Sequence, residues 1–169
     1  MKKLLIAGLV IVMMFSLAAC GGKTVAEEAQ TVEAAGELYA EGVESEVKEY
    51  AASIEEKVGT LKGEVENFMV KHAEAVADET KLTEESWLAD AKGILANIKA
   101  ASESIIEVKA PEALGAVHDE FVKAATYFKD MATTLEGDTS KIVSEGEDHV
   151  KTGLEHLENA AKALTGAAQ

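Results

Sequence analysis

The segment that decides the fold is VESEVKEYAASIEEKVGTLKGEVENFMVKHAEAV, residues 43–76. Its larger apolar residues return at steps of three and four, which is the period of one face of an α-helix. This first stripe consists of Val43, Val47, Tyr50, Ile54, Val58, Leu61, Val65, Phe68, His72 and Val76. The segment therefore predicts a long amphipathic helix. The same period can be traced back to Val32, so it stays open whether the helix begins before Val43.

Three further segments repeat the pattern. Thr83 is the predicted N-cap of the second helix, because its hydroxyl can accept a bond from the first turn. Pro111 ends that helix near Lys109-Ala110 and suits the first turn of the third helix. Asp138 or Thr139 caps the fourth helix. The three inner stripes are Trp87, Ala91, Ile94, Ile98, Ala101 and Ile105; then Leu114, His118, Phe121, Ala125, Phe128, Ala132 and Leu135; then Val143, Gly146, Val150, Gly153, Leu157, Ala160 and Leu164.

Four amphipathic helices joined by short turns are typical of an all-α, antiparallel up-down four-helix bundle. No segment alternates apolar and polar residues with period two, so no sheet is expected. We expect the bundle domain to span residues 43–165. Residues 20–42, which include the flexible Gly21-Gly22 directly after Cys20, form a tether that is partly helical.

The N-terminus has the order of an export signal. Lys2 and Lys3 precede an apolar run, residues 4–15, which is shorter than a comfortable membrane span. The following Leu17-Ala18-Ala19-Cys20 resembles the lipobox of bacterial lipoproteins. That resemblance implies cleavage after residue 19, a diacylglycerol on the Cys20 thiol, and attachment to the outer face of the cell membrane. Cys20 is the only cysteine of the chain, so a disulfide framework is not expected.

The chain is strongly acidic, with a formal charge of −15, and its basic side chains are all lysines. Loss of Lys2 and Lys3 with the signal would bring this charge to about −17. Phosphate backbones would repel such a surface, so nucleic acid is not an expected partner. Anionic lipid headgroups would repel it too, which favours a domain that stands away from the bilayer.

A second resemblance covers residues 84–160. Trp87, the run from Lys109 to Leu114, and His118 with Phe121 are similar to residues of small, all-helical Gram-positive lipoproteins of unknown function. The shared features are a helix led by proline with an early histidine. The resemblance implies export and a helical bundle, and it transfers no activity.

Two glycines lie on the inner stripe of the fourth helix, where glycine weakens a helix. We expect Gly146 and Gly153 to allow close packing against Phe121 and Phe128. The alternative is a groove beside them that admits a ligand.

The four histidines are the candidate metal ligands. If the turns lie near residues 81, 110 and 137, His118 falls level with His156, and His72 falls level with His149, with Glu145 one turn away. The two levels are about 10 Å apart, which rules out a single four-histidine site. Local hydrogen-bonding roles are the simpler interpretation of these side chains, and no cofactor is expected.

Catalytic patterns are not found in the sequence. It has no glycine-rich phosphate loop, no arginine to clamp an anion and no nucleophile elbow. We therefore expect a membrane-anchored extracytoplasmic protein that binds an envelope protein or the cell wall and is not an enzyme. An apolar stripe left exposed after the core is filled would favour this function, and Val25, Val32 and Tyr39 are candidates for it. The alternative function is a carrier of a small ligand or metal.

Overall fold

The computed structural model describes residues 41–166, and its regular elements are all helices. The four long helices are α2 (Glu41–Ala77), α3 (Glu85–Ile106), α4 (Gly115–Gly137) and α5 (Lys141–Gly166). Two short 3-10 helices lie in the connections, η3 (Glu79–Thr83) before α3 and η4 (Glu112–Leu114) before α4. The all-α class predicted from the sequence is therefore confirmed for this part of the chain. We call residues 41–166 the helical region.

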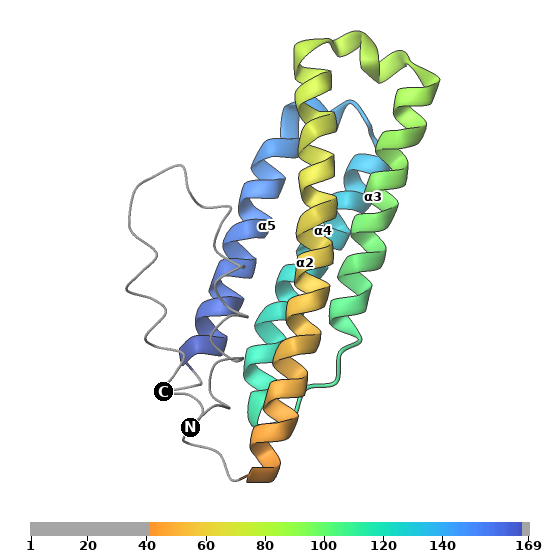
Figure 1. Ribbon diagram of the computed structural model, residues 1–169. Coiled ribbons are helices and arrows are strands. Elements are labelled where there is room, and N and C mark those ends of the chain that lie inside the picture. Colours follow the sequence, from red (N-terminus) through yellow and green to blue (C-terminus); the bar gives the residue numbers. More distant parts are fainter. Residues whose placement is uncertain (1–40, 167–169) are drawn as a thin grey trace, which may run out of the picture.

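Each long helix packs mainly against two others. α2 packs against α3 and α5, and α4 packs against the same two helices. Figure 1 shows the four helices alongside one another, with the connections that contain η3 and residues 138–140 at one end. The connection that contains η4 lies at the other end, where α2 begins. We call the end that carries η3 the distal end.

The core is built from the predicted stripes. Ile54, Leu61, Phe68, Ile98 and Phe128 are completely buried, and burial of such side chains contributes about 1.5–3 kcal/mol each relative to exposure. Two predicted stripe residues, Ile94 and Val143, are only partly buried, and the adjacent Leu95 and Ile142 are completely buried. A third stripe residue, Val76, was placed wrongly. Val76 is 54% exposed, and the neighbouring Ala75 is buried in its place. The stripe advances by seven residues from Phe68 to Ala75, because 3.6 residues per turn favours seven over eight for two turns.

The helix ends differ in detail from the prediction. Thr83 does not cap α3, because its hydroxyl donates to the carbonyl of Thr80 at 2.7 Å inside η3. The capping side chain of this connection is Asp78, which accepts from the backbone N–H of Thr80 at 3.1 Å. A carboxylate is the stronger acceptor for such a turn. At the other end of α3, the helix ends at Ile106, a few residues earlier than the predicted Lys109-Ala110.

The two remaining connections agree more closely with the prediction from the sequence. Pro111 precedes the 3-10 turn that leads into α4, with extended backbone angles of φ −56° and ψ 149°. Asp138 accepts from the backbone N–H of Ser140 at 3.2 Å just before α5, as predicted. Within residues 41–166, no helix is both long enough and apolar enough to cross a membrane.

Candidate functional site

Tyr50 and His118 form a hydrogen-bonded pair between α2 and α4. The Tyr50 hydroxyl lies 3.2 Å from Nδ1 of His118, and the two rings meet edge to face with centroids 5.8 Å apart. Tyr50 is only 3% exposed, and this burial raises its pKa well above the ordinary range for tyrosine. The pair therefore forms a polar link between α2 and α4 at the edge of the core.

Tyr127 lies between two histidines of α5. Its hydroxyl is 3.0 Å from Nδ1 of His149, and its ring centroid is 5.2 Å from that of His156. Nε2 of His149 lies 3.6 Å from a carboxylate oxygen of Glu145, one turn earlier on the same helix. A shallow hollow of about 280 Å³ opens beside Tyr127, Glu145 and His149. The arrangement is a polar cluster at the surface seam of α4 and α5.

His72 is buried in the seam of α2 and α5. It is 6% exposed, and its Nε2 has no hydrogen-bond partner within the helical region. Its ring lies beside that of Phe68, with centroids 6.5 Å apart, and faces the backbone of Gly146. His72 therefore fills space in the core much as an apolar ring would.

The predicted histidine pairs are not the pairs that the structure forms. His118 bonds Tyr50, whereas His156 contacts Tyr127. His118 and Tyr127 are nine residues apart on α4, about two and a half turns, so they point to opposite sides of that helix. The counting of levels placed His72 correctly beside Gly146, but His156 lies at the level of Tyr127, nine residues from His118, and the count gave no direction of a ring around its helix.

The second predicted pair, His72 with His149, is not formed either. His72 lies against Gly146, one turn before His149, but His149 turns toward Tyr127 on α4. Among the residues of the helical region, no three His, Cys, Asp or Glu side chains are grouped so as to hold a metal ion. Cys20, the predicted lipidation site, lies outside the residues that the structure describes.

The two glycines of α5 are covered by aromatic rings. A Cβ added to Gly153 would lie 2.5 Å from Cζ of Phe128, which is the close packing that the sequence predicts. A Cβ added to Gly146 would lie 3.1 Å from Cζ of Phe68 and 3.1 Å from Cδ2 of His72, so its partners come from α2 and not from Phe121. The predicted alternative of a ligand groove at these glycines is wrong, because rings occupy that space.

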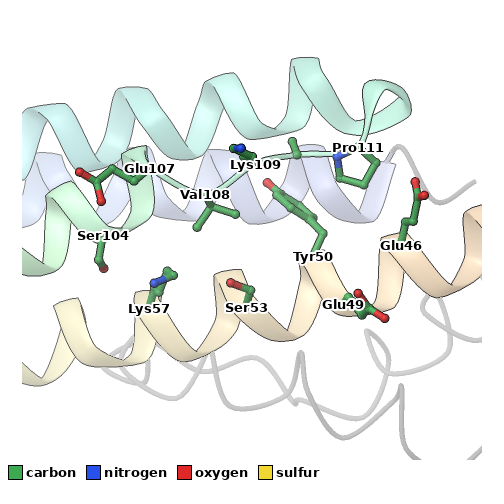
Figure 2. Close-up of a pocket in the computed structure, with 11 residues that line it drawn as sticks. Glu46, Glu49, Tyr50, Ser53, Lys57, Ser104, Glu107, Val108, Lys109 and Pro111 are labelled. Atoms are coloured by element: carbon green, nitrogen blue, oxygen red, sulfur yellow. The ribbon is translucent and has the colours of Figure 1, made fainter.

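A groove does open elsewhere, between α2 and the connection that leads from α3 to α4. It has a volume of about 540 Å³. Figure 2 shows Ser53 and Lys57 on α2 facing Ser104 and Val108 across it. Its lining mixes carboxylates and lysines with a few apolar groups: Glu46, Glu49, Tyr50, Ser53, Lys57, Ser104, Glu107, Val108, Lys109, Ala110 and Pro111.

The last two turns of α2 carry apolar side chains on their solvent side. Val70 is 59% exposed and Val76 is 54% exposed, and they are the large apolar side chains found exposed in the helical region. Ala73 and Ala77 are exposed beside them. Residues 70, 73 and 77 follow helical spacing and so share one face. We call Val70, Ala73, Val76 and Ala77 the apolar strip.

Trp87 of α3 lies next to this end of α2. Its ring Nε1–H donates to a carboxylate oxygen of Glu74 at 2.8 Å, and Nζ of Lys71 lies 5.8 Å from its ring centroid. The bond from Trp87, followed by that from Lys71, lowers the pKa of Glu74. Glu74 is thus held as a carboxylate one turn from Val70.

The apolar strip was not recognised from the sequence. Val76 was assigned to the core, and Val70 lies outside the predicted stripe. The available signal was a second, shorter series, Val70, Ala73 and Ala77, with helical spacing on the opposite side of the same helix. Such a series predicts an exposed apolar face when the first stripe already accounts for the core.

Comparison with known proteins gives no match for this chain among protein families, curated proteins or solved structures.

Proposed function

We propose that the protein is an extracytoplasmic lipoprotein that acts by binding another molecule at the cell envelope, and not by catalysis. Cys20 carries the lipid after the signal, residues 1–19, is removed. The helical region is an antiparallel up-down four-helix bundle that stands above the membrane on the segment that begins at Cys20. Two acyl chains support stable anchoring, whereas one chain gives only marginal binding.

The observation that carries this proposal is the apolar strip. Val is a poorer helix former than Ala, Leu, Glu or Lys, and an exposed Val also leaves apolar surface in water. Both exposed valines nevertheless fall within the same two turns of α2. Exposed apolar side chains that gather on one surface are typical of a contact surface.

The position of the strip agrees with anchoring through the N-terminus. Val70 lies 29 residues after Glu41, the first residue of α2. At a rise of 1.5 Å per residue this is about 43 Å along the helix. A lipid attached upstream of Glu41 would therefore leave the strip accessible to a partner beyond the headgroups.

Replacement of Cys20 tests the anchoring. In the native cells, Cys20→Ser should move the protein from the membrane fraction to the soluble fraction and retain the signal sequence. Ser45→Ala, an exposed change at the start of the helical region, should leave both properties unchanged. Intact-mass analysis of the wild-type protein should show residues 1–19 absent and a diacylglycerol adduct present. If Cys20→Ser stays in the membrane fraction, or if Met1 is retained without an adduct, the proposed location is wrong.

A second candidate function is the carriage of a small polar ligand in the groove of Figure 2. Its volume of about 540 Å³ falls within the range of small-molecule sites. Lys57 and Lys109, with three glutamates, suit a ligand that carries both charges. Native mass spectrometry of protein purified from cells should then show a bound mass that the Lys57→Ala/Lys109→Ala variant loses. Identical masses for the two proteins would exclude this candidate.

A further inference from the structure

The distal end joins an apolar surface to a surplus of negative charge. Residues 66–90 contain seven carboxylates and two lysines. Both lysines are already paired, Lys71 with Glu74 at 3.1 Å and Lys81 with Glu84 at 2.8 Å. Residues 66–90 therefore carry five more carboxylates than lysines (seven less two), and the apolar strip lies within this acidic segment.

The carboxylates are arranged around the strip in a regular way. Glu66 and Glu74 lie one helical turn before and one turn after Val70, and all three side chains are exposed. Asp78 and Glu79 follow directly after the strip and are exposed as well. A partner that covers Val70 must therefore bring its own charged groups close to these carboxylates.

From this juxtaposition we infer that the apolar strip and its carboxylates bind an amphipathic helix of another protein, one that presents apolar residues flanked by Lys or Arg. The inference rests on the proposed function and names the partner class for the same surface. Ala73 and Ala77 lie one turn apart on the same face as Val70, and their short side chains allow a second helix to approach α2 closely. Complementary charge then directs the encounter and fixes its orientation.

Other occupants fit less well. A second copy of this chain would bring seven carboxylates against seven, and like charges oppose association. A bilayer is disfavoured by anionic headgroups and by the distance of about 43 Å from the start of α2. A basic helix is the occupant that satisfies both the apolar strip and the charge around it.

Site-specific photo-crosslinking in the native cells tests this inference on the full-length protein. A benzophenone amino acid is placed at position 73, in the middle of the strip, or at position 96, an exposed alanine on α3 that serves as the control. Mass spectrometry identifies the crosslinked segment. We expect position 73 to join a protein segment rich in Lys or Arg and in apolar residues, and position 96 not to do so.

Two variants sharpen the test. Val70→Ser/Val76→Ser should lower the crosslinking yield from position 73 at least fivefold, and so should Glu66→Gln/Glu79→Gln. Glu155→Gln/Glu158→Gln, which changes two exposed carboxylates on α5, should leave the yield unchanged. The inference is overturned if position 73 gives no protein adduct, or if its adduct is a lipid, a second copy or an acidic segment. It is also overturned if position 96 gives the same adduct or if the valine variant crosslinks as well as the wild type.

This result can be separated from a failure of the proposed function. Membrane fractionation of the Cys20→Ser variant reports on anchoring alone. Correct anchoring without the expected adduct removes this inference and leaves the anchored location in place. If the Cys20→Ser variant stays in the membrane fraction without its lipid, the proposed location is wrong, whatever the crosslinks show.

Discussion

The ring of Phe128 lies directly against the backbone of Gly153. A Cβ built on residue 153 would be 2.5 Å from Cζ, 2.7 Å from Cε1 and 2.8 Å from Cε2 of that ring. Phe128 is completely buried, so its ring has no solvent side into which it can move. The distance between α4 and α5 at this level therefore depends on the absence of a side chain at position 153.

Gly153→Ala should destabilise the protein for this reason. Overpacking of a filled core costs about 1–3 kcal/mol, which exceeds the gain of about 1 kcal/mol from the better helix propensity of Ala. The measurement is the free energy of unfolding from urea denaturation followed by circular dichroism. Gly93→Ala on α3 is the matched control, since a Cβ there meets nothing within 4 Å. That variant should gain about 0.5–1 kcal/mol, and an unchanged or raised stability of Gly153→Ala would contradict the close contact.

Gly146→Ala should fall between these two variants. Its Cβ would be 3.1 Å from Phe68 and from His72, so both rings must give way by only a few tenths of an ångström. The propensity gain then offsets most of the packing cost, and we expect a net change in the free energy of unfolding of about 0–1 kcal/mol in the destabilising direction. The expected order of stability is Gly93→Ala, then Gly146→Ala, then Gly153→Ala. Any reversal between the last two would show that the Phe128 ring is the more compliant neighbour.

The fold class and the packing of the last helix could be predicted from the sequence because they depend on local spacing. The stripe of α5 placed Gly153 inside, and a small inner residue requires a large partner, which is Phe128. Pro111 and Asp138 were likewise found where they were expected, since their effects act on residues next to them in the chain. Asp78 has the same role as Asp138, but Thr83 was chosen in its place because the intervening 3-10 helix was not foreseen.

The histidine contacts could not be predicted because they depend on directions between helices. Counting residues from the turns does not tell which neighbouring helix His118 faces, and it faces Tyr50 on α2, whereas His156 lies beside Tyr127. The exposure of Val76 was missed for a related reason. Near the end of α2, a shift of one position in the spacing decides which side chain reaches the core. The buried position is Ala75, and Val76 next to it is exposed.

Tyr50 should make the protein sensitive to alkali. Burial raises its pKa above the ordinary value of 10, so the folded state holds the phenol neutral while the unfolded chain releases the proton at about pH 10. This stabilising difference is fully present below pH 10 and is lost as the pH rises further. Urea denaturation at increasing pH should show stability falling above pH 10, and ultraviolet absorbance should show the Tyr50 phenolate only as the protein unfolds.

Tyr50→Phe is the control for that titration. The variant lacks the ionisable group, so its stability should vary less with pH above 10 than that of the wild type. At neutral pH it should be less stable by about 0.5–1.5 kcal/mol, because His118 loses a hydrogen-bond partner. An equally steep alkaline decline in both proteins would mean that other groups cause it.

Glu74 should control the fluorescence of Trp87, the only tryptophan in the chain. The bonds that Glu74 accepts from Trp87 and Lys71 lower its pKa below 4.5. The stabilisation from this carboxylate is therefore present above pH 4.5 and is lost as the pH falls through the lowered pKa. Acid titration should shift the emission of Trp87 only below pH 4.5, and Glu74→Gln should remove this acid step. Glu85→Gln, an exposed change two residues from Trp87, should keep it.

Asp78 and Asp138 should stabilise the two distal connections in the same manner. Each carboxylate accepts from a hydroxyl and from a backbone N–H two residues on, in Thr80 and Ser140 respectively. The hydroxyl bond is the main cause of the lowered pKa of each group. The stabilisation is thus present above the ordinary value of 3.8 and is lost as the pH falls through the lowered pKa.

Replacement of either aspartate by alanine should therefore lower the melting temperature at neutral pH, by about 2–4 °C each. The difference from the wild type should shrink below pH 3.8, where the wild-type carboxylate becomes protonated and loses its advantage as an acceptor. Differential scanning calorimetry across this pH range is the measurement, with Asp148→Ala on the exposed face of α5 as the matched loss of charge. A difference that persists unchanged in acid would mean that the aspartates act through helix propensity or packing and not as charged acceptors.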